Sequence, residues 1–226
     1  AVVYVPSVEG KLISTVSFQH GTIASDAEAP SNSALGGGQN ILLSALASTG
    51  LVAVAPDFIG FGASVDIMHP YYVEDMTATS VINAVYASRE VATMEEVEID
   101  NDLYLAGYSQ GGYATMASHK YHEENNVPFY DLKASFAASG GYDIKAFQEY
   151  FFAQDTYHQP FFMAYVAQAY VESLDMGTLT DFFNEPYASV IPDYFDGSMT
   201  GPQINAQLTD VVADLVNNDL LENIDK

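Results

Sequence analysis

The residues best suited to chemistry lie in the stretch 107–112, which reads Gly-Tyr-Ser-Gln-Gly-Gly. An apolar run at 103–106 precedes it, and apolar residues at helical spacing follow it. A serine at the centre of such a strand-turn-helix unit adopts a strained backbone, and its hydroxyl is exposed above the carboxyl end of a sheet. Gly107 and Gly111 lack side chains, so the strand and the helix can approach closely. We therefore predict that Ser109 is a nucleophile.

Two backbone N–H groups could stabilise the negative charge that develops when a serine attacks a carbonyl group. The N–H of Gln110 lies at the expected start of the helix, where the helix dipole favours an anion. The tripeptide 20–22, His-Gly-Thr, follows a predicted strand, and its glycine allows the loop to turn inward. We expect the N–H groups of Thr22 and Gln110 to form an oxyanion hole.

The general base is harder to assign, although the chain has five histidines. His119 and His122 follow Ser109 on the predicted helix, and at 1.5 Å per residue they lie roughly 15 to 20 Å away. His20 and His69 precede the serine. In folds that present a catalytic serine on such a strand-turn-helix unit, the acid and then the base follow the serine in the chain. We expect structural roles for both.

His158 has the required order, with Asp143 or Asp155 before it. It falls in a segment where no strand is predicted to hold it, so it is the alternative base. Asp57 precedes the serine, and we expect a structural hydrogen-bonding role for it.

Strands and helices alternate in the first part of the chain, which favours right-handed βαβ units and a mostly parallel sheet covered on both faces. An acidic turn is expected at 95–102. The predicted strands are 1–5, 12–19, 51–55, 103–106 and 132–139, and the predicted helices are 39–48, 72–90 and the segment from the serine turn to about 125.

From Tyr142 onward strand patterns stop and helical patterns follow. Residues 142–195 carry 15 of the 29 aromatic residues, which is more bulky surface than short connecting helices need. The expected division is therefore a core at 1–141 and a helical cap, or lid, at 142–226 that also lines a substrate pocket. The alternative is a helical subdomain that packs only on itself.

Composition excludes several classes of partner. The net charge is −24, from 30 acidic and 6 basic residues, so nucleic acids and anionic membranes would repel the chain. The acidic residues are scattered, so no metal site is predicted, and no cofactor motif is present. There is no cysteine, and no apolar run is long enough to span a bilayer. The chain starts without a leader, so we expect that any signal peptide is absent from it.

Four motifs occur along the chain in this order: 20–22, Pro56-Asp57-Phe58-Ile59-Gly60-Phe61-Gly62, His69-Pro70-Tyr71 and 107–112. With these motifs the chain resembles the α/β-hydrolases of the secretory lipase type. The resemblance implies a mostly parallel α/β-hydrolase sheet with Ser109 as acyl nucleophile, Thr22 and Gln110 as oxyanion donors, and a lid from Tyr142. It also implies an exported, secreted or periplasmic esterase or lipase that needs no cofactor and acts on small-molecule or lipid esters.

The chain supplies about five strands, and no strand pattern follows Ser139. We therefore expect a sheet that is incomplete at its C-terminal strands, with the catalytic Asp and His beyond Lys226. Either they lie on a second chain that is the remaining C-terminal part of the same hydrolase, or they have been cut away. Two other readings stay open: a serine peptidase similar to prolyl oligopeptidase, and a non-catalytic hydrolase-fold fragment or binding module.

The acidic composition generates a first prediction. Because salt screens repulsion among the acidic side chains, the melting temperature should hold or rise as NaCl is raised from low to molar concentration. Differential scanning calorimetry at increasing NaCl measures this. A steady fall in the melting temperature would contradict it.

Overall fold

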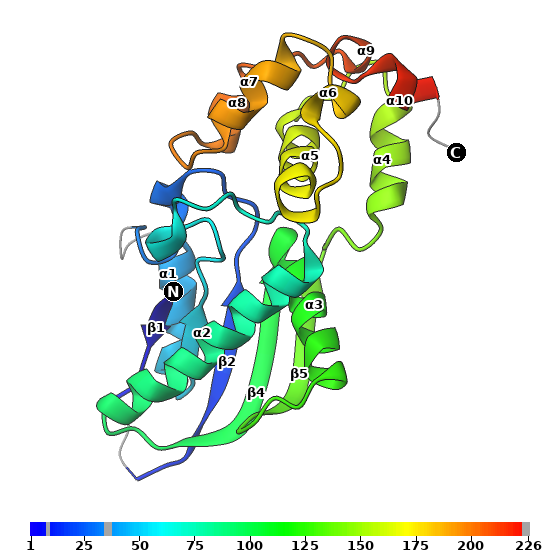
Figure 1. The fold of residues 1–226 in the computed structure, drawn as a ribbon. Coiled ribbons are helices and arrows are strands. Elements are labelled where there is room, and N and C mark those ends of the chain that lie inside the picture. Colours follow the sequence, from blue (N-terminus) through cyan, green and yellow to red (C-terminus); the bar gives the residue numbers. More distant parts are fainter. Residues whose placement is uncertain (8–9, 34–37, 223–226) are drawn as a thin grey trace.

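A computed structural model describes residues 1–7, 10–33 and 38–222 of the chain. It contains a five-stranded sheet with the order β1-β3-β2-β4-β5. Strands β3, β2, β4 and β5 are parallel, and β1 pairs antiparallel with β3 (Figure 1). The strands are β1 (Val2–Tyr4), β2 (Ile13–Gln19), β3 (Val52–Ala55), β4 (Ile99–Tyr108) and β5 (Asp131–Ala138).

Three helices cover this sheet unequally. Helices α2 (Glu74–Met94) and α3 (Gln110–Glu124) share a hydrophobic core with one face, where Leu103 and Leu105 of β4 are fully buried. Helix α1 (Gly38–Ser48) packs on the other face, mainly against β3 and β1. Two 3-10 turns, η1 (Asp26–Glu28) and η2 (Gly62–Ser64), lie in the loops at the carboxyl end of the sheet.

The rest of the described chain, residues 144–222, consists of short helices that we call the helical segment. It lies above the carboxyl ends of the strands (Figure 1). An apolar core of its own holds it together, and Ala24 and Tyr71 of the sheet half join that core. Its helices are α4 (Ile144–Phe152), α5 (Phe161–Leu174), α6 (Leu179–Phe182), α7 (Tyr187–Tyr194), α8 (Gly201–Asn205), α9 (Val212–Leu215) and α10 (Asn218–Glu222).

The fold confirms the predicted α/β class and the mostly parallel sheet. The acidic turn expected at 95–102 is wrong in its second half, because β4 already begins at Ile99. There Ile99 pairs with Ile13 of β2, and Asp102 pairs with Asp131 of β5. Strand pairing on both sides of β4 outweighs the low strand propensity of its aspartates and asparagine.

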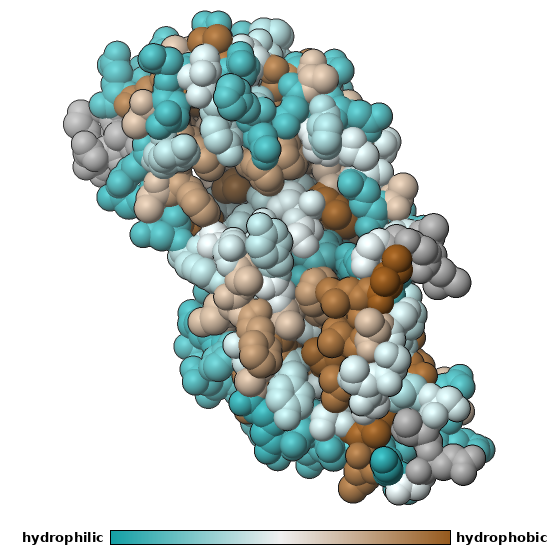
Figure 2. Space-filling model, turned by 180° about the vertical axis from the view of Figure 1, so that it is seen from behind, coloured by the Kyte–Doolittle hydropathy of each residue, from teal (hydrophilic) through white to brown (hydrophobic). Residues whose placement is uncertain are grey.

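The back of the sheet is only partly covered. Helix α1 shields β1 and β3, but Tyr108 of β4 and Phe136 of β5 are 61% and 62% exposed. Seen from behind, hydrophobic side chains gather over the lower half of the molecule, where the sheet lies (Figure 2). Strand β5 is also the last strand of the sheet within the described residues, so its outer edge has no strand partner there.

Within the described ranges, no helix has the length and apolar character needed to cross a membrane.

Glycine requirements at the sheet generate the second prediction. A Cβ added to Gly111 would overlap the carbonyl oxygen of Gln19, whereas one added to Gly38 meets nothing within 4 Å. Gly111→Ala should therefore lower the free energy of unfolding by about 3 kcal/mol or more, and the control Gly38→Ala should change it by less than about 0.5 kcal/mol. Urea denaturation measures both. Equal effects of the two substitutions would show that the close approach is not required.

Candidate active site

Ser109 connects β4 to α3 in a backbone conformation that is unusual for a residue with a side chain. Its φ and ψ angles are 57° and −123°, a region that costs free energy and persists only where the surrounding structure enforces it. The Ser109 hydroxyl does not cap α3. Instead, Ser109 lines a cavity between the sheet and the helical segment. The hydroxyl is thus left available for chemistry.

The glycines around Ser109 make this turn possible. A Cβ on Gly107 would overlap the carbonyl oxygen of Gly111, and a Cβ on Gly112 would overlap that of Ala138. Strand β4, helix α3 and the end of β5 therefore meet backbone to backbone. The predicted need for glycine at 107 and 111 agrees with these contacts, and Gly112 is a further position that the sequence pattern did not single out.

The loop after β2 lies directly beside Ser109. A Cβ added to Gly21 would be 3.7 Å from Ser109 Cβ, so the loop that contains Thr22 passes beside the serine. Within the described residues, neither the N–H of Thr22 nor that of Gln110 donates to a backbone or side-chain acceptor. Gln110 is the first residue of α3, whose opening N–H groups have no acceptor in the helix. The arrangement offers two donors next to one hydroxyl.

A buried chain of hydrogen bonds joins the 56–62 loop to Gln110, the residue after Ser109, through His69. His69 Nδ1 is 2.6 Å from the carbonyl oxygen of Ile59, which can only accept, so Nδ1 carries the proton. His69 Nε2 is 2.6 Å from Gln110 Nε2 and accepts from that amide. The 56–62 loop thereby holds His69, and His69 holds the side chain of the residue after Ser109.

Burial keeps this histidine neutral. Its side chain lies among the rings of Phe58, Phe61, Tyr71 and Tyr165. Burial lowers the pKa of His69 to about 3, although its hydrogen bond to Ile59 opposes the shift. The neutral ring is the form that can donate to Ile59 and accept from Gln110 at once. The sequence suggested a structural role for His69, but not this contact, which joins residues 41 positions apart.

The cavity that Ser109 borders has a volume of about 1020 Å³ and a mainly apolar lining. Among its described lining residues Asp143 is the one with a charged side chain, and that carboxylate accepts a hydrogen bond from the N–H of Ala146 at the start of α4. Aromatic residues of the helical segment form much of the wall, including Phe147, Phe151 and Tyr170.

No histidine among the described residues is hydrogen-bonded to Ser109. His20 contacts the carbonyl oxygens of Gly21 and Asp57. His119 and His122, on α3, contact Ser135 and the carbonyl oxygen of Tyr130. His158 is exposed and lies outside the set that lines the cavity. Among the described residues, the loop that contains Thr22 and the start of α3 thus lie beside Ser109, and no histidine is hydrogen-bonded to its hydroxyl.

The other polar groups singled out by sequence have structural surroundings. Asp57 accepts hydrogen bonds from the N–H and the hydroxyl of Ser31, as expected for a structural residue. Across the described part of the chain no group of three or more His, Cys, Asp or Glu side chains could hold a metal ion.

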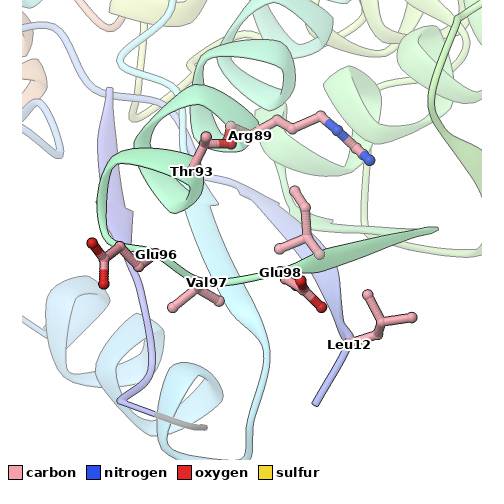
Figure 3. A pocket seen from close by; sticks show the side chains of 7 residues that line it. Leu12, Arg89, Thr93, Glu96, Val97 and Glu98 are labelled. Carbon is pink, nitrogen blue, oxygen red and sulfur yellow. The ribbon is translucent and has the colours of Figure 1, made fainter. Parts of the chain in front are cut away.

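A second pocket, of about 520 Å³, lies at the opposite end of the sheet (Figure 3). Arg89 and Thr93 of α2 reach it, but Arg89 already donates to the carbonyl oxygens of Asp100 and Phe129. The ten residues of β4 separate this pocket from Ser109, a distance of roughly 30 Å. It takes no part in the Ser109 site.

Comparison with known proteins agrees with the fold. Residues 26–129 match the family model of the secretory lipases. A putative hydrolase from Legionella pneumophila is 25% identical, with a TM-score of 0.86 over 98% of this chain. The rice cell wall degrading esterase LipA from Xanthomonas oryzae is 23% identical with a TM-score of 0.85, and Candida antarctica lipase A in its closed state is 18% identical with a TM-score of 0.70. No curated protein matches the chain.

The chain has a lipase-like α/β-hydrolase fold. It spans 60% of the Legionella chain, 61% of LipA and 52% of the Candida lipase. The resemblance stated from the sequence motifs is thereby confirmed.

Neutral His69 generates the third prediction. The unfolded chain binds a proton at His69 near pH 6.5, while the folded chain binds it only near pH 3. The contribution of neutral His69 to the free energy of unfolding is therefore complete above pH 6.5, and an amount on the order of 4 kcal/mol is lost as the pH is lowered towards 3. His69→Gln keeps a donor and an acceptor but cannot be protonated, so its free energy of unfolding should depend less steeply on pH.

Urea denaturation in steps from pH 7 to pH 4, at constant salt, tests this. The exposed His158→Gln is the matched control and should keep the slope of the original protein. Identical slopes for all three proteins would mean that His69 is not the acid-sensitive group.

Proposed function

We propose that the protein is a serine-dependent carboxylic ester hydrolase in which Ser109 is the nucleophile. The observation that carries the proposal is the strained backbone of Ser109, which turns a hydroxyl that does not cap α3 towards an apolar cavity. The similarity of residues 26–129 to the secretory lipases supports the same reaction class.

The reaction would be acyl transfer in two steps. A base removes the Ser109 hydroxyl proton, the oxygen attacks the ester carbonyl, and the N–H groups of Thr22 and Gln110 stabilise the oxyanion. The alcohol leaves with a proton from the base, and water then hydrolyses the acyl-enzyme. The position of Gln110 at the start of the 15-residue helix α3 adds the helix dipole to this stabilisation.

The cavity favours acyl chains over peptides as substrates. Its aromatic and aliphatic walls can bury hydrocarbon. Among the described lining residues the one charged side chain, Asp143, already caps α4, so none of them offers a free charge to orient a peptide. Residues 142–226, which include the helical segment, would act as a lid over a catalytic core formed by residues 1–141. The likeness to secretory lipases supports a secreted or periplasmic enzyme.

We further propose that residues outside this chain complete the triad. Strand β5 has an open outer edge within the described residues, and Phe136 beside it is 62% exposed. An added strand would pair with that edge and cover the face, and its end would lie at the same side of the sheet as Ser109. The base and its acid would come from there. His158 is the alternative within the chain.

The rival function is a binding module that keeps the fold without catalysis. The observation that favours it is the lack of a hydrogen-bonded base beside Ser109 among the described residues. Labelling of Ser109 by an organophosphate would exclude it, because only an activated serine reacts.

Ser109→Ala is the fourth prediction. In the full enzyme it should reduce hydrolysis of a p-nitrophenyl ester by a factor on the order of a million, because a triad nucleophile cannot be replaced. Circular dichroism should show an unchanged fold. Activity within about tenfold of the original would refute the assignment.

Two measurements separate the alternatives. Turnover of a p-nitrophenyl ester alongside a peptide anilide distinguishes an esterase from a serine peptidase. The intact mass of the active protein shows whether it contains more than these 226 residues of 24.5 kDa. If this chain alone hydrolyses esters, then His158→Gln should abolish activity and the external base is refuted.

A further inference from the structure

Tyr71 lies between the oxyanion loop and the helical segment. Its hydroxyl is 2.7 Å from Thr22 Oγ1, so a hydrogen bond joins them across 49 residues of sequence. The Tyr71 side chain is 2% exposed, and burial raises its pKa well above the usual value, so the phenol keeps its proton. A buried hydroxyl held in this way is a fixed anchor for Thr22.

The other side of Tyr71 is held by the helical segment. Its ring stacks on Tyr165 of α5, with ring centres 4.4 Å apart and an angle of 12° between the planes. Tyr165 stacks in turn on Phe195, which follows α7, again at 4.4 Å. A row of packed rings therefore runs from the helical segment to the loop beside Ser109.

Thr22 needs such an anchor because its loop has no regular structure. Residues 20–25 belong to no helix or strand, and Gly21 gives the backbone unusual freedom. An oxyanion donor stabilises the transition state only if its direction is set before the reaction. The N–H of Thr22 has no acceptor among the described residues that could set it.

We propose that Tyr71 is a positioning residue that sets the orientation of Thr22 through its hydroxyl and links that orientation to α5 through its ring. The inference rests on the function proposed above and adds a role for the helical segment. When α5 is seated against Tyr71, the oxyanion loop is held in place. When α5 moves away, Tyr71 loses the ring contact that fixes it, and Thr22 loses its orientation.

The hydroxyl link is tested with Tyr71→Phe, Thr22→Val and the double variant, in the whole protein that hydrolyses p-nitrophenyl acetate. Tyr71→Phe keeps the ring stack, so it should lower kcat about tenfold, which is less than the loss expected for removing an oxyanion donor, and leave KM within about twofold. The double variant should match Thr22→Val, because the hydroxyl acts through Thr22. Thr22→Ser keeps the hydroxyl and should restore most of kcat.

Tyr130→Phe is the matched control. Tyr130 is buried and donates to the carbonyl oxygen of Val85 at 3.0 Å, in the core far from the Ser109 cavity. Loss of the Tyr130 hydroxyl should lower the free energy of unfolding as much as Tyr71→Phe does, without changing kcat or KM. If the Tyr71 hydroxyl had only a structural role, Tyr71→Phe and Tyr130→Phe would both lower stability and both keep kcat.

The ring link is tested with Tyr165→Leu and Tyr165→Phe. Tyr165 is not among the described residues that line the cavity, so its substitution should leave KM for a short ester unchanged. Any effect should fall on kcat, through the ring contact with Tyr71. We expect Tyr165→Leu to lower kcat as Tyr71→Phe does, and Tyr165→Phe, which keeps the stack, to retain it.

Each outcome decides a different point. If the original protein neither turns over the ester nor is labelled at Ser109, the proposed function fails and takes this inference with it. If the original protein is active and Tyr71→Phe has the same kcat, only the role of Tyr71 is overturned. Multiplying losses in the double variant would show that Tyr71 and Thr22 act independently, which also overturns it.

Discussion

Helix α3 meets the ends of β2 and β4 so closely that no Cβ fits at Gly107 or Gly111. This contact forces the single connecting residue, Ser109, into a conformation that a side chain normally avoids. The same contact brings the start of α3, where the N–H of Gln110 has no acceptor among the described residues, to the carboxyl ends of the parallel strands. The rest of the site depends on this backbone packing, because it determines where the hydroxyl and the N–H of Gln110 lie.

Two neutral, buried side chains hold the loops on either side of Ser109. His69 bridges Ile59 and Gln110, and Tyr71 bridges Thr22 and Tyr165. A charged group at either position would be costly, because an apolar pocket does not solvate it. Burial therefore lowers the pKa of His69 and raises that of Tyr71, so both side chains stay neutral. The two side chains that hold these loops are therefore uncharged, although the chain has 30 acidic residues.

The two sides of the sheet differ in how completely their strands are paired and buried. Strand β3 is buried along its whole length between β1 and β2, with α1 packed against it. Strand β5 pairs only with β4 within the described residues and alternates between exposed and half-buried positions. An open edge next to an exposed phenylalanine is a surface that proteins normally cover. Within the described residues, the β5 side of the sheet is therefore less covered than the β1 side.

The amino-acid sequence by itself determined the local features whose cause is local. Glycine spacing identified the turn at Ser109, apolar runs identified the central strands, and helical periodicity identified the region after Tyr142. These features depend on neighbours within a few residues, so a single sequence reveals them. The early start of β4 at Ile99 was missed, since pairing with distant strands decided it.

The tertiary structure alone decided which distant side chains meet at the site. Nothing in the sequence links His69 to Gln110 or Tyr71 to Thr22, because each pair is more than 40 residues apart and meets only once the sheet has formed. The apolar cavity likewise exists only where the helical segment lies above the strand ends. Periodicity reports which face of an element is buried, but the partner across that face is chosen by the packing of the whole chain.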